Sequence, residues 1–280
     1  MDIVIHLQTN KEEAGSGCMK LNNVLVIYSD SRTSEHKNTI KAVKAAMKKN
    51  RIRAAFVKKE KKNKSLKGKF DLVVSIGGDG TFIESSQLIR DKTLILGVNS
   101  DPLHSEGAHT SATRKDFEAK MKKIIEGDFS VEKWTRLEVT IDHKKSSVLS
   151  LNEIYIGAAQ LYNTSRYWLF VNRIWEEQKS SGVIFSTGCG STAWYSSAGG
   201  RPFSKTSKEG RFIVREPYCG HLVCGRTING IIKEGDSVHI RSNMRDGMIA
   251  IDSAAVYPFP KNKEASIRVS DKPLHVIVFD

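Results

Sequence analysis

The stretch FDLVVSIGGDGT, residues 70–81, decides the fold of the first part of the chain. Residues 70–76 form a largely apolar run, of the kind that is buried on both faces in a parallel sheet. Gly77 and Gly78 follow it directly and let the backbone turn sharply, and residues 82–89 have the pattern of a helix. We therefore expect a strand, a tight loop and a helix in immediate succession.

Strands and helices alternate on both sides of this stretch. Residues 21–29, 52–57 and 93–98 are predicted strands, and residues 34–49 and 111–126 are predicted helices with one apolar face. Such alternation predicts right-handed crossovers and a doubly wound, Rossmann-like α/β domain. We assign residues 1–127 to this domain and expect the last strand, near residues 272–280, to return to it.

The pattern changes after residue 127. Short strand-like runs with turn residues between them follow one another closely, which indicates an antiparallel, sandwich-like β domain over residues 128–280. The predicted strands are residues 134–141, 148–156, 167–175, 182–186, 212–215, 237–241, 248–251, 265–269 and 275–279.

The bulk composition is that of an ordinary globular protein. The chain has 280 residues, of which 39% are hydrophobic and 27% charged, and no apolar run approaches the roughly 20 residues that span a bilayer. The first ten residues lack the pattern of a secretory signal, so the cytoplasm is the default compartment. Four cysteines are too few for a disulfide framework, and Cys219 and Cys224 lack the second ligand pair of a zinc site. We expect reduced thiols.

The positive charge is concentrated at the start of the chain. The formal net charge is +13, and residues 1–70 contain 17 Lys and Arg against 6 Asp and Glu. This charge could attract nucleic acid or nucleotide phosphates, or it could simply form a solvated face. The lysine-rich segment Lys58–Lys69 contains no aromatic residue for base stacking, which argues against nucleic acid as the partner.

The first candidate site is the loop Gly77-Gly78-Asp79-Gly80-Thr81. Glycines at the end of a buried strand allow close approach of a diphosphate, and the following helix directs free N–H groups toward it. We therefore assign Gly77, Gly78, Gly80 and Thr81 to phosphate binding. The charge of Asp79 would repel a phosphate, so this residue is better explained as the acceptor of a hydroxyl proton or as a metal ligand.

Two further candidate sites lie in the β-rich half. Asn152 and Glu153 are polar residues between apolar neighbours, and they suit contacts to a ribose or an adenine edge, although a simple turn would explain them too. The small and hydroxylated residues 186–194, preceded by Ser180-Ser181-Gly182, lead into a predicted helix start and form a second anion and ribose site. There we assign Thr187, Gly190 and Ser191 to nucleotide binding.

The GGDGT loop resembles that of the superfamily containing NAD kinases, diacylglycerol and sphingosine kinases, and phosphofructokinases. All three motifs in this order resemble the NAD kinase family, and the likeness is closest to its mitochondrial-type members. Two further segments, Gly97-Val98-Asn99-Ser100-Asp101-Pro102 and Ser105-Glu106-Gly107, support this likeness. The resemblance implies a phosphofructokinase-like first domain, ATP-dependent phosphorylation of NAD to NADP, Mg²⁺, a homodimer or higher homo-oligomer, and mitochondria as a second compartment.

The resemblance also implies roles for individual residues. Asp79 would be the base for the adenosine 2′-hydroxyl of NAD, with Gly80 beside it. Asn152 and Glu153 would contact the dinucleotide, and Thr192, Ala193 and Ser197 would line the NAD pocket. The chain departs from the family at Ser180-Ser181-Gly182, at Gly188-Cys189 and at Asp252-Ser253, which affects fine nucleotide contacts rather than the reaction class.

Two alternatives remain at the level of sequence. A lipid kinase of the diacylglycerol or sphingosine type shares the glycine loop but would need an apolar groove for acyl chains, and no amphipathic membrane helix is evident. A non-catalytic dinucleotide- or nucleic-acid-binding protein would explain the departures and the basic first segment.

Overall fold

The computed structural model describes residues 12–13, 19–31, 33–61 and 69–279, and divides the chain into two compact units. The first unit is Met1–Lys133 with Leu274–Asp280, and the second is Trp134–Pro273. The start of the chain with Cys18 and most of the lysine-rich segment lie outside the described residues.

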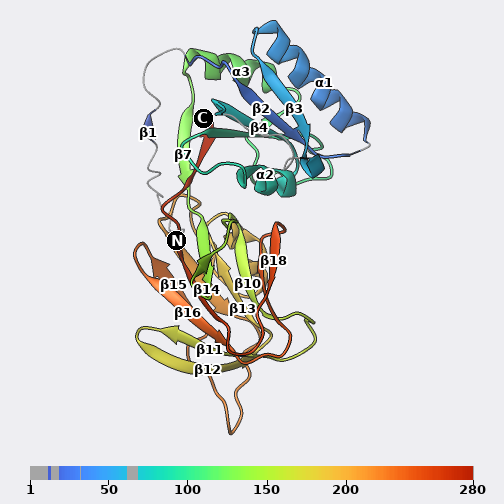
Figure 1. The fold of residues 1–280 in the computed structure, drawn as a ribbon. Helices are drawn as coiled ribbons and strands as arrows, with labels where there is room; N and C mark the ends of the chain where they lie inside the picture. Colours follow the sequence, from blue (N-terminus) through green and yellow to red (C-terminus); the bar gives the residue numbers. More distant parts are fainter. Residues whose placement is uncertain (1–11, 14–18, 32, 62–68, 280) are drawn as a thin grey trace, which may run out of the picture. The chain divides into compact units, whose positions relative to one another are not determined.

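The first unit is a predominantly parallel sheet with helices packed on it (Figure 1). The order of the strands is β1-β7-β20-β5-β4-β2-β3, with β6 paired to β5. The strands are β1 (Glu12–Glu13), β2 (Val24–Tyr28), β3 (Ala54–Lys58), β4 (Leu72–Gly77), β5 (Leu94–Asn99), β6 (Ala112–Thr113), β7 (Ser130–Trp134) and β20 (Leu274–Val278). The helices are α1 (Ser34–Lys49), η1 (Lys59–Lys61), α2 (Asp79–Ser86) and α3 (Phe117–Glu126).

Local sequence explains these elements. All six residues of β4 are buried, as expected for a strand covered on both faces. The Thr33 hydroxyl caps α1 by accepting the N–H of His36 at 3.3 Å, and α3 ends at Gly127, whose φ of 79° is left-handed. Met121 and Ile124 bury the inner face of α3 in the core. The predicted α/β domain is confirmed.

Two helices begin elsewhere than predicted. Helix α2 begins at Asp79 rather than at residue 82, because the Gly78 carbonyl already accepts the N–H groups of Thr81 and Phe82. Asp79 therefore belongs to the first turn of the helix. Helix α3 begins at Phe117 rather than at residue 111, because Ala112–Thr113 pair with β5 as strand β6.

The second unit consists of two six-stranded antiparallel sheets, in the orders β15-β14-β13-β10-β17-β18 and β12-β11-β16-β19-β8-β9. Apolar side chains of both sheets form one core, which makes the unit a sandwich as predicted. Its elements are β8 (Leu137–Ile141), β9 (Lys144–Lys145), β10 (Glu153–Ala158), β11 (Ser165–Val171), β12 (Ile174–Ser180), β13 (Val183–Ser186), η2 (Gly190–Thr192), α4 (Trp194–Ser197), β14 (Glu209–Val214), β15 (Asn229–Lys233), β16 (Ser237–Ser242), β17 (Gly247–Ile251), β18 (Ala255–Pro258) and β19 (Glu264–Val269).

Several strands differ from their predicted extents. The predicted strand 167–175 is a hairpin of β11 and β12, turned by Asn172 and Arg173 with left-handed φ angles of 52° and 66°. The predicted domain boundary at residue 127 lies before β7, of which all residues but Trp134 belong to the first unit. Strand β20 returns to the first sheet and pairs with β5 in parallel.

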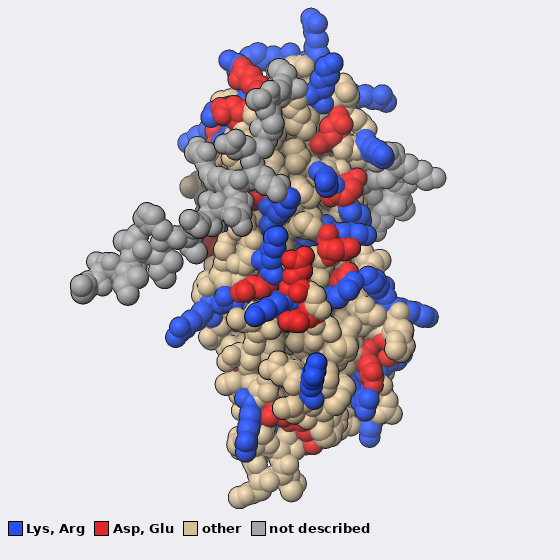
Figure 2. Space-filling model, turned by 90° about the vertical axis from the view of Figure 1, so that its left-hand side faces the viewer, with Lys and Arg blue, Asp and Glu red and all other residues tan. Residues whose placement is uncertain are grey.

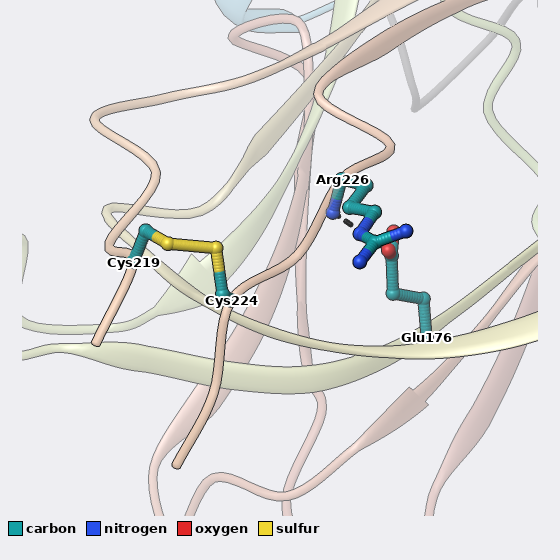
Figure 3. Close-up of a disulfide and its surroundings, with 4 residues drawn as sticks. All are labelled: Glu176, Cys219, Cys224 and Arg226. Carbon is teal, nitrogen blue, oxygen red and sulfur yellow. Dashed lines mark hydrogen bonds between the residues drawn. A yellow bond between two sulfur atoms is a disulfide. The ribbon is translucent and has the colours of Figure 1, made fainter. Parts of the chain in front are cut away.

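The expectation of reduced thiols is wrong for Cys219 and Cys224, which form a disulfide (Figure 3). The two residues are antiparallel bridge partners whose Cα atoms lie 4.1 Å apart, so the backbone brings their side chains together. The Glu176 carboxylate accepts the N–H groups of Arg226 at 2.6 Å and Thr227 at 2.7 Å beside this loop. Cys189 is buried and does not form a disulfide.

Charged side chains of both signs are interspersed on the face drawn in Figure 2. Many basic residues of the first unit are paired, for example Lys58 with Asp30 at 2.7 Å and Arg114 with Glu35 at 2.7 Å. Exposed ion pairs of this kind are typical of a solvated charged face. Among the described residues, no helix is long and apolar enough to cross a membrane.

Candidate functional site

The glycine loop packs closely against its own helix and against the segment after β5. A Cβ atom at Gly77 would lie 2.4 Å from the Thr81 hydroxyl oxygen, and one at Gly78 would lie 2.6 Å from the Ser105 hydroxyl oxygen. A side chain at Gly77 would therefore clash with Thr81, whereas one at Gly78 would require the Ser105 hydroxyl to rotate away. Gly80 differs, because nothing lies within 4 Å of the place of its Cβ. The backbone of the loop is thus open at Gly80, where a ligand can approach.

Asp79 is held by a turn that lies 30 residues further along the chain. Its Oδ1 accepts the backbone N–H of His109 at 2.8 Å and lies 3.1 Å from Nδ1 of the His109 ring. Its Oδ2 accepts the N–H of Ala108 at 3.2 Å. The Asp79 side chain is 28% exposed, whereas that of His109 is only 4% exposed. His109 therefore lies behind the carboxylate, which keeps an accessible side.

These contacts set the ionisation of Asp79. Partial burial by itself would raise the pKa of Asp79, but hydrogen bonds from the ring and backbone of His109 and from Ala108 outweigh it and lower the pKa. The position of Asp79 in the first turn of α2 also favours a negative charge. Asp79 is consequently a carboxylate at neutral pH, able to accept a proton.

In the second unit, Asp252 organises the turn that carries Asn152 and Glu153. Its carboxylate accepts the Ser150 hydroxyl at 2.8 Å and the N–H groups of Leu151, Asn152 and Glu153 at 2.8, 3.0 and 2.9 Å. These bonds keep residues 150–152 out of β10, which begins at Glu153 instead of at the predicted residue 148.

The Glu153 carboxyl is poorly solvated. Burial raises the pKa of Glu153 to about 7, and the nearby Asp252 carboxylate raises it too. Burial also raises the pKa of Asp252, despite the hydrogen bonds that it accepts. Oε2 of Glu153 is buried without a hydrogen-bond partner in the described structure, so it can accept a donor from a ligand.

The loop after β13 packs directly onto this turn. The Thr187 N–H donates to the Asn152 carbonyl at 2.9 Å, and a Cβ at Gly190 would lie 2.3 Å from the same carbonyl oxygen. The Thr187 hydroxyl donates to the Leu151 carbonyl, and the Ser191 hydroxyl donates to the Gly188 carbonyl at 2.7 Å. The second and third predicted sites are thus one continuous structure in the second unit.

The residues of this loop fall into two groups. Thr187, Gly190 and Ser191 are buried, and their hydrogen bonds hold the loop together rather than point outward. Thr192, Ala193 and Ser197 are exposed and free to meet a ligand. The predicted helix start consists of the short helices η2 and α4 instead of one longer helix.

Two residues of the site were missed by the sequence reasoning. His109 follows the Ser105-Glu106-Gly107 segment, which drew attention only through the resemblance. Asp252 was noted only as part of the Asp252-Ser253 pair, which departs from the family at Ser253, and its carboxylate shapes the Asn152–Glu153 turn. Both act on residues far away in the chain, so no local pattern singles them out.

Comparisons with known proteins agree with these features. The model of the ATP-NAD kinase N-terminal domain matches residues 12–129, and that of the C-terminal domain matches residues 138–279. A probable NADH kinase from Oryza sativa subsp. japonica is 25% identical, covering 93% of this chain and 86% of its own length. An NAD kinase from Clostridium botulinum (strain Alaska E43 / Type E3) is 31% identical over 75% of this chain and 74% of its own.

Solved structures show the same fold. An NAD kinase from Archaeoglobus fulgidus in complex with ATP superposes with a TM-score of 0.71 at 23% identity, over 92% of this chain and 93% of the other. A yeast NADH kinase complexed with NADH gives a TM-score of 0.78 at 14% identity, over 93% and 84% of the two chains.

Both units are matched by models of the same kinase family, which sets aside the lipid-kinase and non-catalytic alternatives. The predicted activity, ATP-dependent phosphorylation of NAD, is confirmed along with the family. The chain belongs to the ATP-NAD kinase family.

Proposed function

We propose that Asp79 is the general base of this NAD kinase. The proposal rests on one observation, that the Asp79 carboxylate is kept ionised by hydrogen bonds and stays partly exposed. It lies next to Gly80, where the backbone is open. Among the described residues, Oδ2 has one donor, whereas Oδ1 lies within hydrogen-bonding distance of two. Oδ2 is therefore the oxygen that would take up the proton.

In the proposed step, the 2′-hydroxyl of the adenosine ribose of NAD loses its proton to Asp79 while its oxygen attacks the γ-phosphorus of ATP. The bond between the γ-phosphorus and the bridging oxygen breaks, and ADP leaves with that electron pair. Such transfers depend mainly on positioning and electrostatic stabilisation, so few side chains need to react. Mg²⁺, which we propose enters with ATP, would offset the charge of the phosphates.

The second unit supplies the proposed dinucleotide contacts. The exposed Thr192, Ala193 and Ser197 would line the NAD pocket, while the buried Thr187, Gly190 and Ser191 would shape the loop that presents them. Glu153 has a buried oxygen without a protein donor and would accept a hydroxyl or amine of the ligand. Asn152 would contact the dinucleotide from the same turn.

Replacement of Asp79 tests the proposal. Asp79→Asn should lower kcat by about 10²–10⁴-fold, with NAD affinity changed little, because a positioned base acts in the transition state. The assay is NADP formation from NAD, ATP and Mg²⁺, with the exposed Asp128→Asn as a control that should leave kcat unchanged. A folded Asp79→Asn protein with near-normal kcat would remove Asp79 from this role.

The same assay addresses the finer features of the proposal. Among the relatives are both NAD kinases and NADH kinases, so NAD and NADH should be compared as acceptors. We propose a homodimer or higher homo-oligomer as the active form, which sedimentation during turnover would test. A mitochondrial-type affiliation, with mitochondria or the cytoplasm as the compartment, stays a prediction that localisation of a tagged chain can check.

A further inference from the structure

The turn at residues 107–110 is built to meet Asp79. Gly107 has a left-handed φ of 65°, and the Thr110 hydroxyl and N–H close the turn onto the Gly107 carbonyl at 2.8 and 2.9 Å. The turn directs the consecutive N–H groups of Ala108 and His109 at the carboxylate. Because only glycine adopts such an angle readily, the conformation of the turn depends on Gly107.

The sheet is shaped to receive this turn. A Cβ at Gly97 in β5 would lie 2.6 Å from the His109 carbonyl oxygen and 2.9 Å from the ring of Phe82 in α2. The absence of a side chain at Gly97 thus allows the turn to lie directly on β5. The His109 ring also packs on Phe82, with ring centroids 5.7 Å apart. Contacts on the strand and on the helix fix the ring in place.

The geometry points to His109 as a positioning residue for Asp79, and this inference rests on the proposed role of Asp79 as the base. A carboxylate is an acceptor, so the His109 Nδ1 that lies 3.1 Å from Oδ1 must carry the proton. With Oδ1 occupied by the His109 ring and backbone, rotation of the carboxylate is restrained and Oδ2 remains as the acceptor. His109 therefore selects which oxygen of Asp79 reacts.

The hydrogen bond from the His109 side chain also helps to lower the pKa of Asp79. The other charged or titratable side chains on the surrounding segments are Glu84 on α2 and Asp101, His104 and Glu106 after β5. Glu84 pairs with Lys59 at 3.2 Å, and Asp101 pairs with His104 at 2.9 Å. Loss of the donor at His109 should thus change the ionisation of Asp79 directly.

The test compares three variants of the full chain. His109→Leu keeps a similar volume but has no donor, whereas His109→Asn places an amide donor near the position of Nδ1. His104→Ala removes an exposed histidine of the same segment and serves as the control. For each protein, kcat and KM for NAD are measured between pH 3 and 9, because the pKa of Asp79 is lowered from its ordinary value of 3.8. The melting temperature at each pH establishes that the chain is folded.

We expect His109→Leu to lower kcat by about 10- to 100-fold, because a misplaced base costs about that much, with KM for NAD nearly unchanged. The acidic limb of kcat/KM should move up by about one pH unit, because the charged carboxylate has lost a hydrogen bond. His109→Asn should recover most of kcat and keep the acidic limb near its original position. His104→Ala should behave like the unaltered chain.

A folded His109→Leu protein with normal kcat and an unmoved acidic limb would overturn the inference. So would His109→Asn that is as impaired as His109→Leu, since that would indicate packing alone. If His109→Leu fails to fold, carbon-13 NMR titration of the Asp79 carboxyl in His109→Asn decides, because a large upward pKa shift there contradicts the role of the donor. Normal turnover of Asp79→Asn would instead refute the proposed base, independently of His109.

Discussion

The buried Glu153 carboxyl should make the second unit less stable as the pH rises. Its pKa is raised to about 7 in the folded chain from an ordinary value of 4.5. Below pH 4.5 the group is protonated in both the folded and the unfolded state, so it contributes no pH dependence. Between pH 4.5 and 7 the unfolded state loses its proton first, so the free energy of unfolding falls as the pH rises.

The magnitude follows from the size of the pKa shift. A shift from 4.5 to about 7 corresponds to about 3 kcal/mol at 1.36 kcal/mol per pH unit, lost in full above pH 7. Glu153→Gln has no proton to lose in this range and should not show this loss. The amide has its own unpaired atom to bury, so the useful quantity is how the stability difference between the two proteins changes with pH.

Hydrogen exchange of the β10 and β17 amides in increasing urea reports the stability of the unit that carries Glu153. The free energy of unfolding of Glu153→Gln, minus that of the unaltered chain, is measured at pH 5 and at pH 8. This difference should be about 2–3 kcal/mol more favourable to the variant at pH 8 than at pH 5. The exposed Glu234→Gln is the matched control and should show no such shift. An identical stability difference at pH 5 and pH 8 would refute the reasoning.

Two further predictions concern the second unit. Gly190→Ala would place a Cβ 2.3 Å from the Asn152 carbonyl oxygen, so the free energy of unfolding should fall by about 1–3 kcal/mol and NAD binding, measured by calorimetry, should weaken several-fold. Unchanged affinity and stability would contradict the packing described. The double variant Cys219→Ser, Cys224→Ser removes the disulfide, whose cysteines are 5 residues apart in sequence. Protection of residues 215–227 in hydrogen exchange should fall by about 2 kcal/mol while β10 stays protected. Equal protection of residues 215–227 in both proteins would contradict this prediction.

The elements with a strong local pattern were predictable from sequence. Strand β4 and the glycine loop predicted the α/β unit, because a strand buried on both faces is a continuous apolar run in the sequence and a sharp turn requires glycines. The closely spaced strands indicated the sandwich for a similar reason. The hairpin at Asn172–Arg173 was missed. These two non-glycine residues adopt left-handed φ angles, which such residues rarely do, so the sequence did not predict a turn there.

The site was predictable only in part, for a different physical reason. Asp79 stood out because it places a negative charge in a glycine loop suited to phosphate, and Asn152 and Glu153 because they are polar residues between apolar neighbours. Their partners were not visible, because His109 meets Asp79 across 30 residues and Asp252 reaches the Asn152 turn across 100. Contacts between such distant residues are created by the tertiary fold, and a single sequence carries no local trace of them.

The place of β20 has a consequence for how the protein is made. This strand lies between β5 and β7 in the first sheet, yet it follows the whole of the second unit in the chain. A ribosome that has released residues 1–133 has therefore released a sheet with a missing central strand. Domains usually fold in the order of their synthesis. Here the second unit can complete its fold before the first, because the first lacks β20 until residues 274–278 have been made. The unit that carries Asp79 is completed only after residues 274–278 have been made.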